Sequence, residues 1–113
     1  MTTVSASTLH PALDPYRDKL ISATAAAQLI RPGQHVFIGT ACATPRTLVN
    51  ALEALPKPPD DVELVHFLTT SAVPHRDGKA STHYRHRTFF VSSDIRAAVR
   101  QGLAEYVPIS IAQ

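Results

Sequence analysis

Short apolar runs rich in β-branched and aromatic residues alternate along this chain with stretches that favour helix. The runs are residues 35–39 (HVFIG), 62–68 (VELVHFL), 88–92 (TFFVS) and 104–110 (AEYVPIS). Continuous apolar runs are typical of strands buried on both faces. Their alternation with helices predicts βαβ units. The expected fold class is therefore α/β, a mainly parallel open sheet with flanking helices.

The first two helical stretches carry start and stop signals. Residues 16–31 are rich in alanine and predict a helix, within which Ser22 or Thr24 could cap a second one. Arg-Pro-Gly at 31–33 ends this stretch. The next helix is expected over 46–55, because Thr44 suits the N-cap and Pro45 suits the first helical position.

The second half of the chain continues the pattern after the prolines and aspartates of residues 56–61. Residues 71–87 are polar, basic and turn-rich, so they are expected to be mostly loop. Ser93 is expected to cap a helix over 94–101, and Gly102 closes it. Each strand is thus expected to be followed by a turn, a loop or a helix start.

The bulk properties exclude several classes of protein. The 113 residues suffice for one small domain, and a net charge of +2 does not indicate a nucleic-acid partner. A single cysteine permits no internal disulfide, and no apolar run reaches the ~20 residues that span a membrane. Residues 1–14 show no secretory signal and are expected to form a flexible lead-in to a domain over 15–113. A cytoplasmic protein without a membrane partner is expected.

The strongest candidate site is the run of small residues that joins the first strand to a helix start. It consists of Gly39, Thr40, Ala41, Cys42, Ala43, Thr44 and Pro45. Ligands of open α/β sheets bind outside the carboxyl ends of strands, where backbone N–H groups suit a phosphate, a carboxylate or an oxyanion. No P-loop or dinucleotide fingerprint is present. Two interpretations stay open: an anion-binding loop, or a tight turn that needs small residues for packing.

Single side chains offer weaker candidates. Cys42 could be a nucleophile at a helix N-terminus, although a packed cysteine is the favoured interpretation. His66 lies in an apolar strand and is expected to be a hydrogen-bonded core residue rather than a catalyst.

A basic segment over residues 75–87 could contact a polyanion, but a solvated loop is the favoured interpretation. Its histidine spacing fits no common zinc pattern, so no metal site is expected. The segment contains His75, Arg76, Lys79, His83, Arg85, His86 and Arg87.

No carboxylate is expected in an apolar, site-like context. The acidic residues assigned to the lead-in, a helix surface or loops are Asp14, Asp18, Glu53, Asp60, Asp61 and Asp77.

Three strings resemble the N-terminal domain of the acetyl-CoA hydrolase/transferase (4-hydroxybutyrate CoA-transferase-like) family. They are YRDKLISATAAAQLIRPGQHVFIGTACATPRTLVNAL from residue 16, DVELVHF from residue 61, and RTFFVSSDIRAAVRQGLAEYVPISI from residue 87. The last is the most specific, with FFV, a short helix containing Arg96, then Gly102 and YVPIS. The resemblance covers roughly residues 15–113.

The resemblance implies a fold and an activity. Members have two similar α/β domains of the NagB/RpiA/CoA-transferase type, and this chain looks incomplete relative to that architecture. They move CoA between carboxylic acids or hydrolyse an acyl-CoA. A glutamate attacks the thioester to give an anhydride and then a glutamyl-CoA thioester. That glutamate belongs to the C-terminal domain, so we expect no catalytic residue in this chain and no activity from it alone.

The resemblance also implies substrates, partners and a site. Acyl-CoA, coenzyme A and a small carboxylate are the expected ligands, with no covalently bound cofactor. A C-terminal catalytic domain or partner chain, and a homo-oligomer, are expected. The loop Gly39–Pro45 matches a glycine-rich GGF…G-x-P loop of related CoA-transferases, with Pro45 retained, Ala43 replacing a glycine and no Gly-Gly-Phe. Arg96 is a candidate contact for CoA phosphates. The alternative is a non-catalytic module that binds CoA, phosphate or a carboxylate, or an assembly subunit of the same fold.

Overall fold

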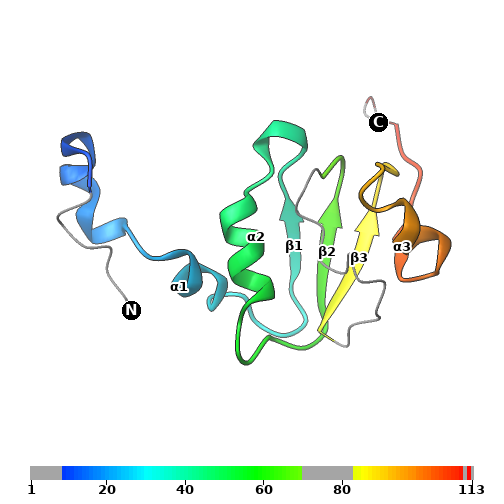
Figure 1. Cartoon of the computed structure of the whole chain (residues 1–113), viewed down its shortest axis with the longest axis horizontal. Coiled ribbons are helices and arrows are strands. Elements are labelled where there is room, and N and C mark those ends of the chain that lie inside the picture. The colour runs from blue at the N-terminus through cyan, green and yellow to red at the C-terminus, as the bar shows by residue number, and fades with distance from the viewer. Residues whose placement is uncertain (1–8, 70–82, 111, 113) are drawn as a thin grey trace.

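A computed structural model describes residues 9–69, 83–110 and 112, and its centre is a four-stranded parallel sheet (Figure 1). The strands lie in the order β1-β2-β3-β4. Their bounds are His35–Ile38 for β1, Val62–His66 for β2, Tyr84–Thr88 for β3 and Ala104–Tyr106 for β4. The predicted α/β class with a parallel open sheet and flanking helices is confirmed.

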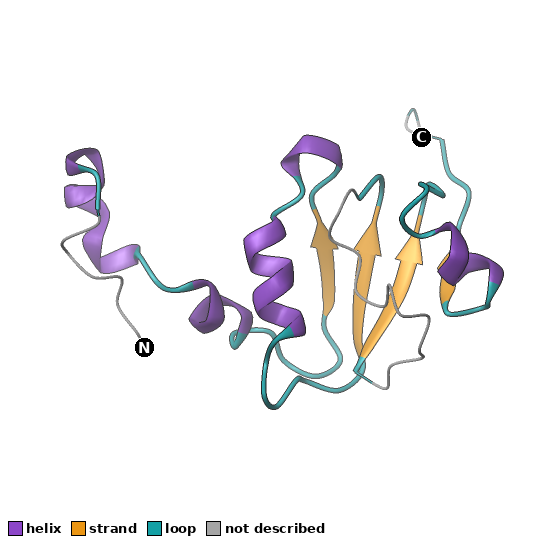
Figure 2. Cartoon of the chain, in the orientation of Figure 1, coloured by secondary structure: helices purple, strands orange, loops and turns teal. Residues whose placement is uncertain are grey.

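Short helices surround the sheet (Figure 2). The α-helices are α1 (Ala23–Ala27), α2 (Arg46–Glu53) and α3 (Arg96–Arg100), and the 3₁₀ helices are η2 (Pro11–Lys19) and η3 (Ala41–Ala43). No helix of the described residues is long and apolar enough to cross a membrane.

Residues 16–31 do not form one continuous helix, but the predicted second helix capped by Ser22 is present. The chain turns to an extended conformation at Leu20 and Ser22, which separates η2 from α1. Ser22 then starts a new helix, because its hydroxyl accepts a hydrogen bond from the Ala25 N–H at 3.1 Å. The side chains of η2 are exposed, and Figure 1 shows this segment standing away from the sheet.

Helices α2 and α3 cover the same face of the sheet. The larger core cluster joins Val49 and Leu52 of α2 to Ile38 of β1 and Leu64 of β2. A smaller cluster joins Ala104 of β4 to Ile95, Ala98 and Val99 around α3. The even-numbered strand residues therefore form the core face.

The odd-numbered strand residues form the opposite face, which carries a row of charges. Arg87 pairs with Glu63 at 2.7 Å and with Glu105 at 3.2 Å, and His35 lies 3.5 Å from Glu63. The Glu63 side chain is only 5% exposed. The expectation that no carboxylate lies in an apolar context is therefore wrong, since Glu63 sits between Val62 and Leu64 in a buried strand.

Strand β3 starts four residues earlier than predicted. Residues 84–87 read as basic loop by composition, yet Tyr84, His86 and the following Thr88 are buried while Arg85 faces outward. The Tyr84 hydroxyl donates to the Leu52 carbonyl at 2.9 Å, and burial, assisted by the nearby Glu53, raises the pKa of Tyr84. Hydrogen bonds thus let polar side chains occupy core positions of this strand.

Candidate functional site

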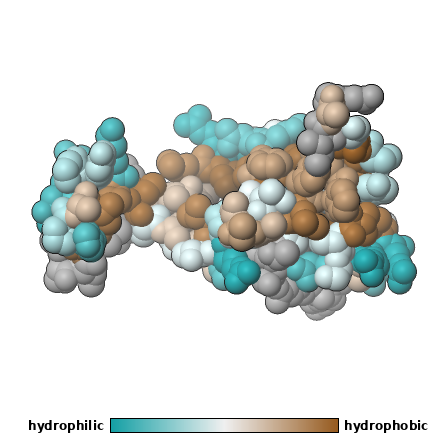
Figure 3. All heavy atoms as spheres, turned by 90° about the horizontal axis from the view of Figure 1, so that it is seen from above, coloured by the Kyte–Doolittle hydropathy of each residue, from teal (hydrophilic) through white to brown (hydrophobic). Residues whose placement is uncertain are grey.

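The carboxyl ends of the parallel strands meet at one edge of the sheet, where ligands of open α/β sheets bind. The chain segments that follow the strands there are 39–45, 67–69, 89–92 and 107–110. Figure 3, which looks down on this edge, shows hydrophobic residues gathered over it. Phe90 and Ile109 leave more than half of their surface exposed. The edge therefore offers apolar surface beside the Gly39–Pro45 loop.

The Gly39–Pro45 loop is a tight turn that needs its glycine. A Cβ atom at Gly39 would lie 2.5 Å from the carbonyl oxygen of Ala43. Ala41 adopts a positive φ of 48°. The Thr44 hydroxyl donates to the Gly39 carbonyl at 3.0 Å, which closes the turn. These contacts support the interpretation that the small residues serve packing.

The predicted helix start is shifted by one residue. Pro45, not Thr44, occupies the N-cap of α2, and no side chain caps this end. The reason is that the Thr44 hydroxyl is already bonded to Gly39 within the turn. The helix itself is present as predicted, although it ends at Glu53.

Some amides of the loop have partners within the protein. The N–H groups of Ala43, Thr44 and Arg46 donate to carbonyls of the loop itself. Among the described hydrogen bonds, none uses the N–H of Thr40 or Cys42. These two amides, and that of Gly39, which no described hydrogen bond uses either, are available to a ligand oxygen.

The loop is fastened to the segment that follows β2. The Thr40 hydroxyl lies 3.2 Å from both the N–H and the carbonyl oxygen of Leu68. The Ala41 N–H donates to the same carbonyl at 2.5 Å. Because Leu68 follows β2, the turn after β1 is held by the neighbouring strand end.

His66 is a hydrogen-bonded core residue, as predicted, and it belongs to a histidine pair. Its side chain is fully buried, its Nδ1 lies 2.7 Å from the Thr69 hydroxyl, and its Nε2 lies 2.9 Å from Nδ1 of His86. One proton lies between the two rings, so His66 accepts from Thr69 in one tautomer and donates to it in the other. Burial lowers the pKa of His66 to about 4, which keeps the ring neutral at neutral pH.

The remaining predicted site residues are not brought together. Cys42 is exposed in the loop. Arg96 is exposed at the start of α3, on the β4 side of the sheet, whereas the loop follows β1 at the other end of the strand order. Neither side chain has a described contact with the other.

Two side chains of the basic segment contact aspartates. His83 lies 2.6 Å from Asp60, and Arg85 lies 3.0 Å from Asp61. His86 is buried in β3, so it is wrong to count it in a solvated loop. His75, Arg76 and Lys79 lie outside the described residues. In the described ranges no group of three metal-ligating side chains occurs.

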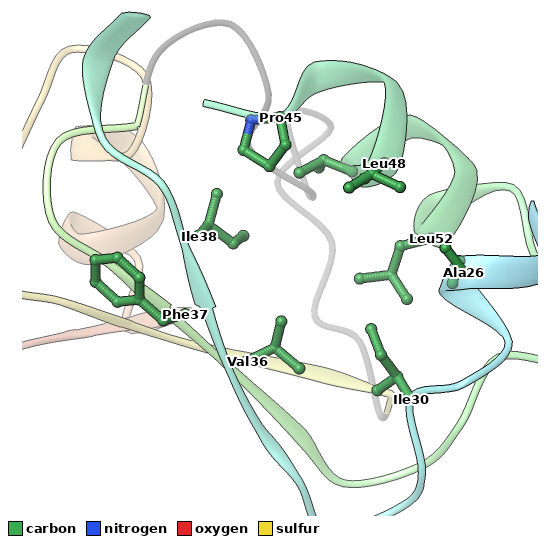
Figure 4. A pocket seen from close by; sticks show the side chains of 10 residues that line it. Ala26, Ile30, Val36, Phe37, Ile38, Pro45, Leu48 and Leu52 are labelled. Atoms are coloured by element: carbon green, nitrogen blue, oxygen red, sulfur yellow. The ribbon is translucent and has the colours of Figure 1, made fainter. Parts of the chain in front are cut away.

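An apolar cavity of about 170 Å³ lies between α1, β1 and α2 (Figure 4). Val36 and Ile38 of β1 face it, with Leu48 and Leu52 of α2 across from them. It opens beside the edge of β1 that pairs with no described strand. Sequence reasoning did not find this cavity.

The fold is that of an α/β domain, and sequence comparison places the chain in a family. The family model described as acetyl-CoA hydrolase/transferase N-terminal domain matches residues 7–113. The chain belongs to this family.

Two curated CoA transferases are similar to this chain. The succinyl-CoA:acetate/propanoyl-CoA:succinate CoA transferase of Fasciola hepatica is 31% identical over 86 residues, covering 74% of this chain and 18% of that protein. The 4-hydroxybutyrate coenzyme A transferase of Clostridium kluyveri is 31% identical over 93 residues, covering 82% of this chain and 22% of that protein. The chain thus spans about a fifth of the length of these relatives.

Solved structures share the fold. RipA from Yersinia pestis matches with a TM-score of 0.66 and 21% identity, over 82% of this chain and 24% of that one. A point mutant of RipA matches with a TM-score of 0.69 and 22% identity over the same shares.

Proposed function

We propose that this chain forms part of the acyl-CoA site of a CoA-transferase or acyl-CoA hydrolase, with the Gly39–Pro45 loop as one wall. Membership of the family supports the substrate class. The observation that carries the site is the placement of the loop at the carboxyl edge of a parallel sheet, fastened to Leu68.

The proposed chemistry is acyl transfer through a glutamate outside residues 1–113. Its carboxylate attacks the thioester carbonyl and expels CoA thiolate, which leaves a mixed anhydride. The thiolate then attacks the glutamyl carbonyl, releases the acyl group as a carboxylate and forms a glutamyl-CoA thioester. An acceptor carboxylate reverses these steps with a new acyl group, or water releases CoA and restores the glutamate.

The loop would stabilise the oxyanion of this reaction. Negative charge develops on the thioester oxygen during attack, and preorganised N–H groups lower its energy. The amides of Gly39, Thr40 and Cys42 are the candidates within the loop, since no described hydrogen bond uses them. The exposed Cys42 side chain is proposed as a site-wall residue rather than the nucleophile. Arg96 stays a proposed contact for CoA phosphates, reached by a ligand that extends along the edge toward β4.

The second candidate is a module that binds CoA or a carboxylate without chemistry, or one that only assembles with a partner. The two candidates predict different activities when a catalytic partner is joined to the chain. A binding module retains CoA on its own, whereas part of an enzyme gains turnover when the glutamate-bearing region is joined to it.

We expect residues 1–113 alone to show no CoA transfer and no thioester hydrolysis with acetyl-CoA. Thioester hydrolysis is measured as thiol release with a chromogenic disulfide, and CoA transfer to an added carboxylate is measured by chromatography of the acyl-CoA products. Binding is followed by amide NMR shifts on addition of acetyl-CoA. Shifts are expected at Thr40 and Cys42, with the amides of α1 as an internal control. Turnover by the purified chain would refute the inactivity, and shifts confined to the α1–β1–α2 cavity would refute the site.

We expect the chain to self-associate through the open edge of β1. Phe37 of β1 is exposed at 62%, and an edge strand without charges or proline invites pairing. Phe37→Lys should lower the mass seen by light scattering several-fold toward that of the monomer. Tyr16→Lys, at an equally exposed aromatic residue in η2, is the matched control. A wild-type monomer at high concentration would contradict this prediction.

A further inference from the structure

We propose that the buried pair His66 and His86 positions the Gly39–Pro45 loop by holding the turn of residues 66–69. In the proposed function this loop is one wall of the ligand site. Only the purpose that we assign to the connection rests on that proposal. The mechanical connection itself is independent of any ligand.

The connection starts at the turn after β2. The His66 Nδ1 and the Thr69 hydroxyl lie 2.7 Å apart, and both side chains are almost fully buried. This contact spans three residues and fixes the path of Leu68 between them. Leu68 in turn holds the loop, because its carbonyl accepts from the Ala41 N–H and its backbone faces the Thr40 hydroxyl.

The His66 ring is held at both of its nitrogens. His86 supplies the second contact at 2.9 Å from the adjacent strand, and the two rings stack with centroids 5.1 Å apart. With both nitrogens engaged, the ring cannot turn without breaking a buried hydrogen bond, which is costly in an apolar core.

The segment after β3 joins the same network. The Ser92 hydroxyl donates to the Thr69 carbonyl at 3.3 Å, and the Phe89 N–H donates to the His66 carbonyl at 3.0 Å. The turns that follow β1, β2 and β3 are thus tied together around one buried imidazole. A leucine at position 66 would fill the core and keep these backbone bonds, but it would lose the two imidazole bonds to Thr69 and His86.

The connection sets the position of the loop amides in the proposed site. The Thr40 and Cys42 amides flank Ala41, whose N–H is fixed on Leu68. Their direction therefore depends on where the turn of residues 66–69 holds Leu68. His66 acts through Thr69 and Leu68, so it is a positioning residue and not a catalytic one.

The test compares Thr69→Val, which keeps the shape and removes the hydroxyl, with Thr69→Ser, which keeps the hydroxyl. Amide hydrogen exchange is measured by NMR on the whole 113-residue chain without ligand. Thr69→Val should speed exchange at Ala41 by about five- to tenfold, the loss expected for one hydrogen bond. Exchange at Leu64 in the middle of β2 should stay unchanged, and Thr69→Ser should restore the wild-type rate at Ala41.

Unchanged exchange at Ala41 in Thr69→Val would overturn the proposal. Equal acceleration at Ala41 and Leu64 would also overturn it, since that result indicates a loss of global stability. Should Thr69→Val fail to fold, Thr40→Val tests the connection from its exposed end, because coupling is reciprocal. The ¹⁵N shift of His66 Nδ1 should then change, and an unchanged shift refutes the connection. None of these measurements involves acetyl-CoA, so a failure of the proposed function would be seen separately in the binding experiment.

Discussion

Gly39→Ala is expected to lower the free energy of unfolding by about 3 kcal/mol. The added Cβ would lie 2.5 Å from the Ala43 carbonyl oxygen and 3.3 Å from its carbon, both backbone atoms of the same turn. Because no side-chain rotation can relieve this contact, the turn must open, at a cost typical of overpacking. Opening would also break the bond from the Thr44 hydroxyl to Gly39, worth about 1 kcal/mol. Urea denaturation measures the change.

Gly102→Ala is the matched control. Gly102 has a positive φ of 74°, but nothing lies within 4 Å of a Cβ built on it. Alanine there should cost only about 1–2 kcal/mol, the strain of a left-handed backbone. If Gly39→Ala proves no more destabilising than Gly102→Ala, the close approach in the turn is not the reason for the glycine.

Lowering the pH from 6.5 to 4 is expected to remove about 3 kcal/mol of stability through His66. Burial lowers the pKa of His66 from 6.5 in the unfolded chain to about 4 in the folded one. Between these values the unfolded state binds a proton that the folded state does not. The contribution is therefore complete above pH 6.5 and is lost as the pH falls toward 4. Denaturation at a series of pH values measures the slope.

His66→Gln should flatten this part of the pH profile, because the amide does not titrate. His10→Gln, at an exposed histidine that precedes η2, should leave the slope as it is in the wild type. The difference between the curves of the three proteins is the quantity to compare. Parallel curves for wild type and His66→Gln would show that His66 is not the group responsible.

The elements predicted well are those in which local pattern and tertiary packing agree. Residues 36–38 are apolar and lie in a strand, and residues 46–53 carry an apolar stripe that packs on it. The strand order could not be read from the sequence. The α/β class could be predicted from the sequence, because helical stretches and apolar runs alternate along it.

The elements predicted poorly are those in which polar side chains are buried by partners distant in sequence. Tyr84 and His86 take core positions because Leu52 and His66 supply hydrogen bonds. Glu63 is buried because Arg87 of the adjacent strand covers it. Arginines alternate with other side chains over residues 84–88, and this period of two favours a strand. The basic composition of residues 84–87 suggested a loop instead.

The candidate loop could be located from the sequence, but its internal bonding could not. A small-residue run after a strand points to the carboxyl edge of a parallel sheet. Whether its amides are open or engaged depends on Thr44 turning back to Gly39 and on Leu68 approaching from β2. Neither contact follows from the order of residues alone.

The hydrogen bonds and close contacts of the Gly39–Pro45 loop determine which of its positions can be substituted without loss of the fold. Gly39 and Thr44 are constrained by contacts inside the turn, and Thr40 by its bonds to Leu68. The side chains of Cys42 and Ala43 are exposed and make no described side-chain hydrogen bond. A combinatorial library intended to alter ligand preference should therefore randomise positions 42 and 43 and leave the other three unchanged. Most of its members would then keep the fold.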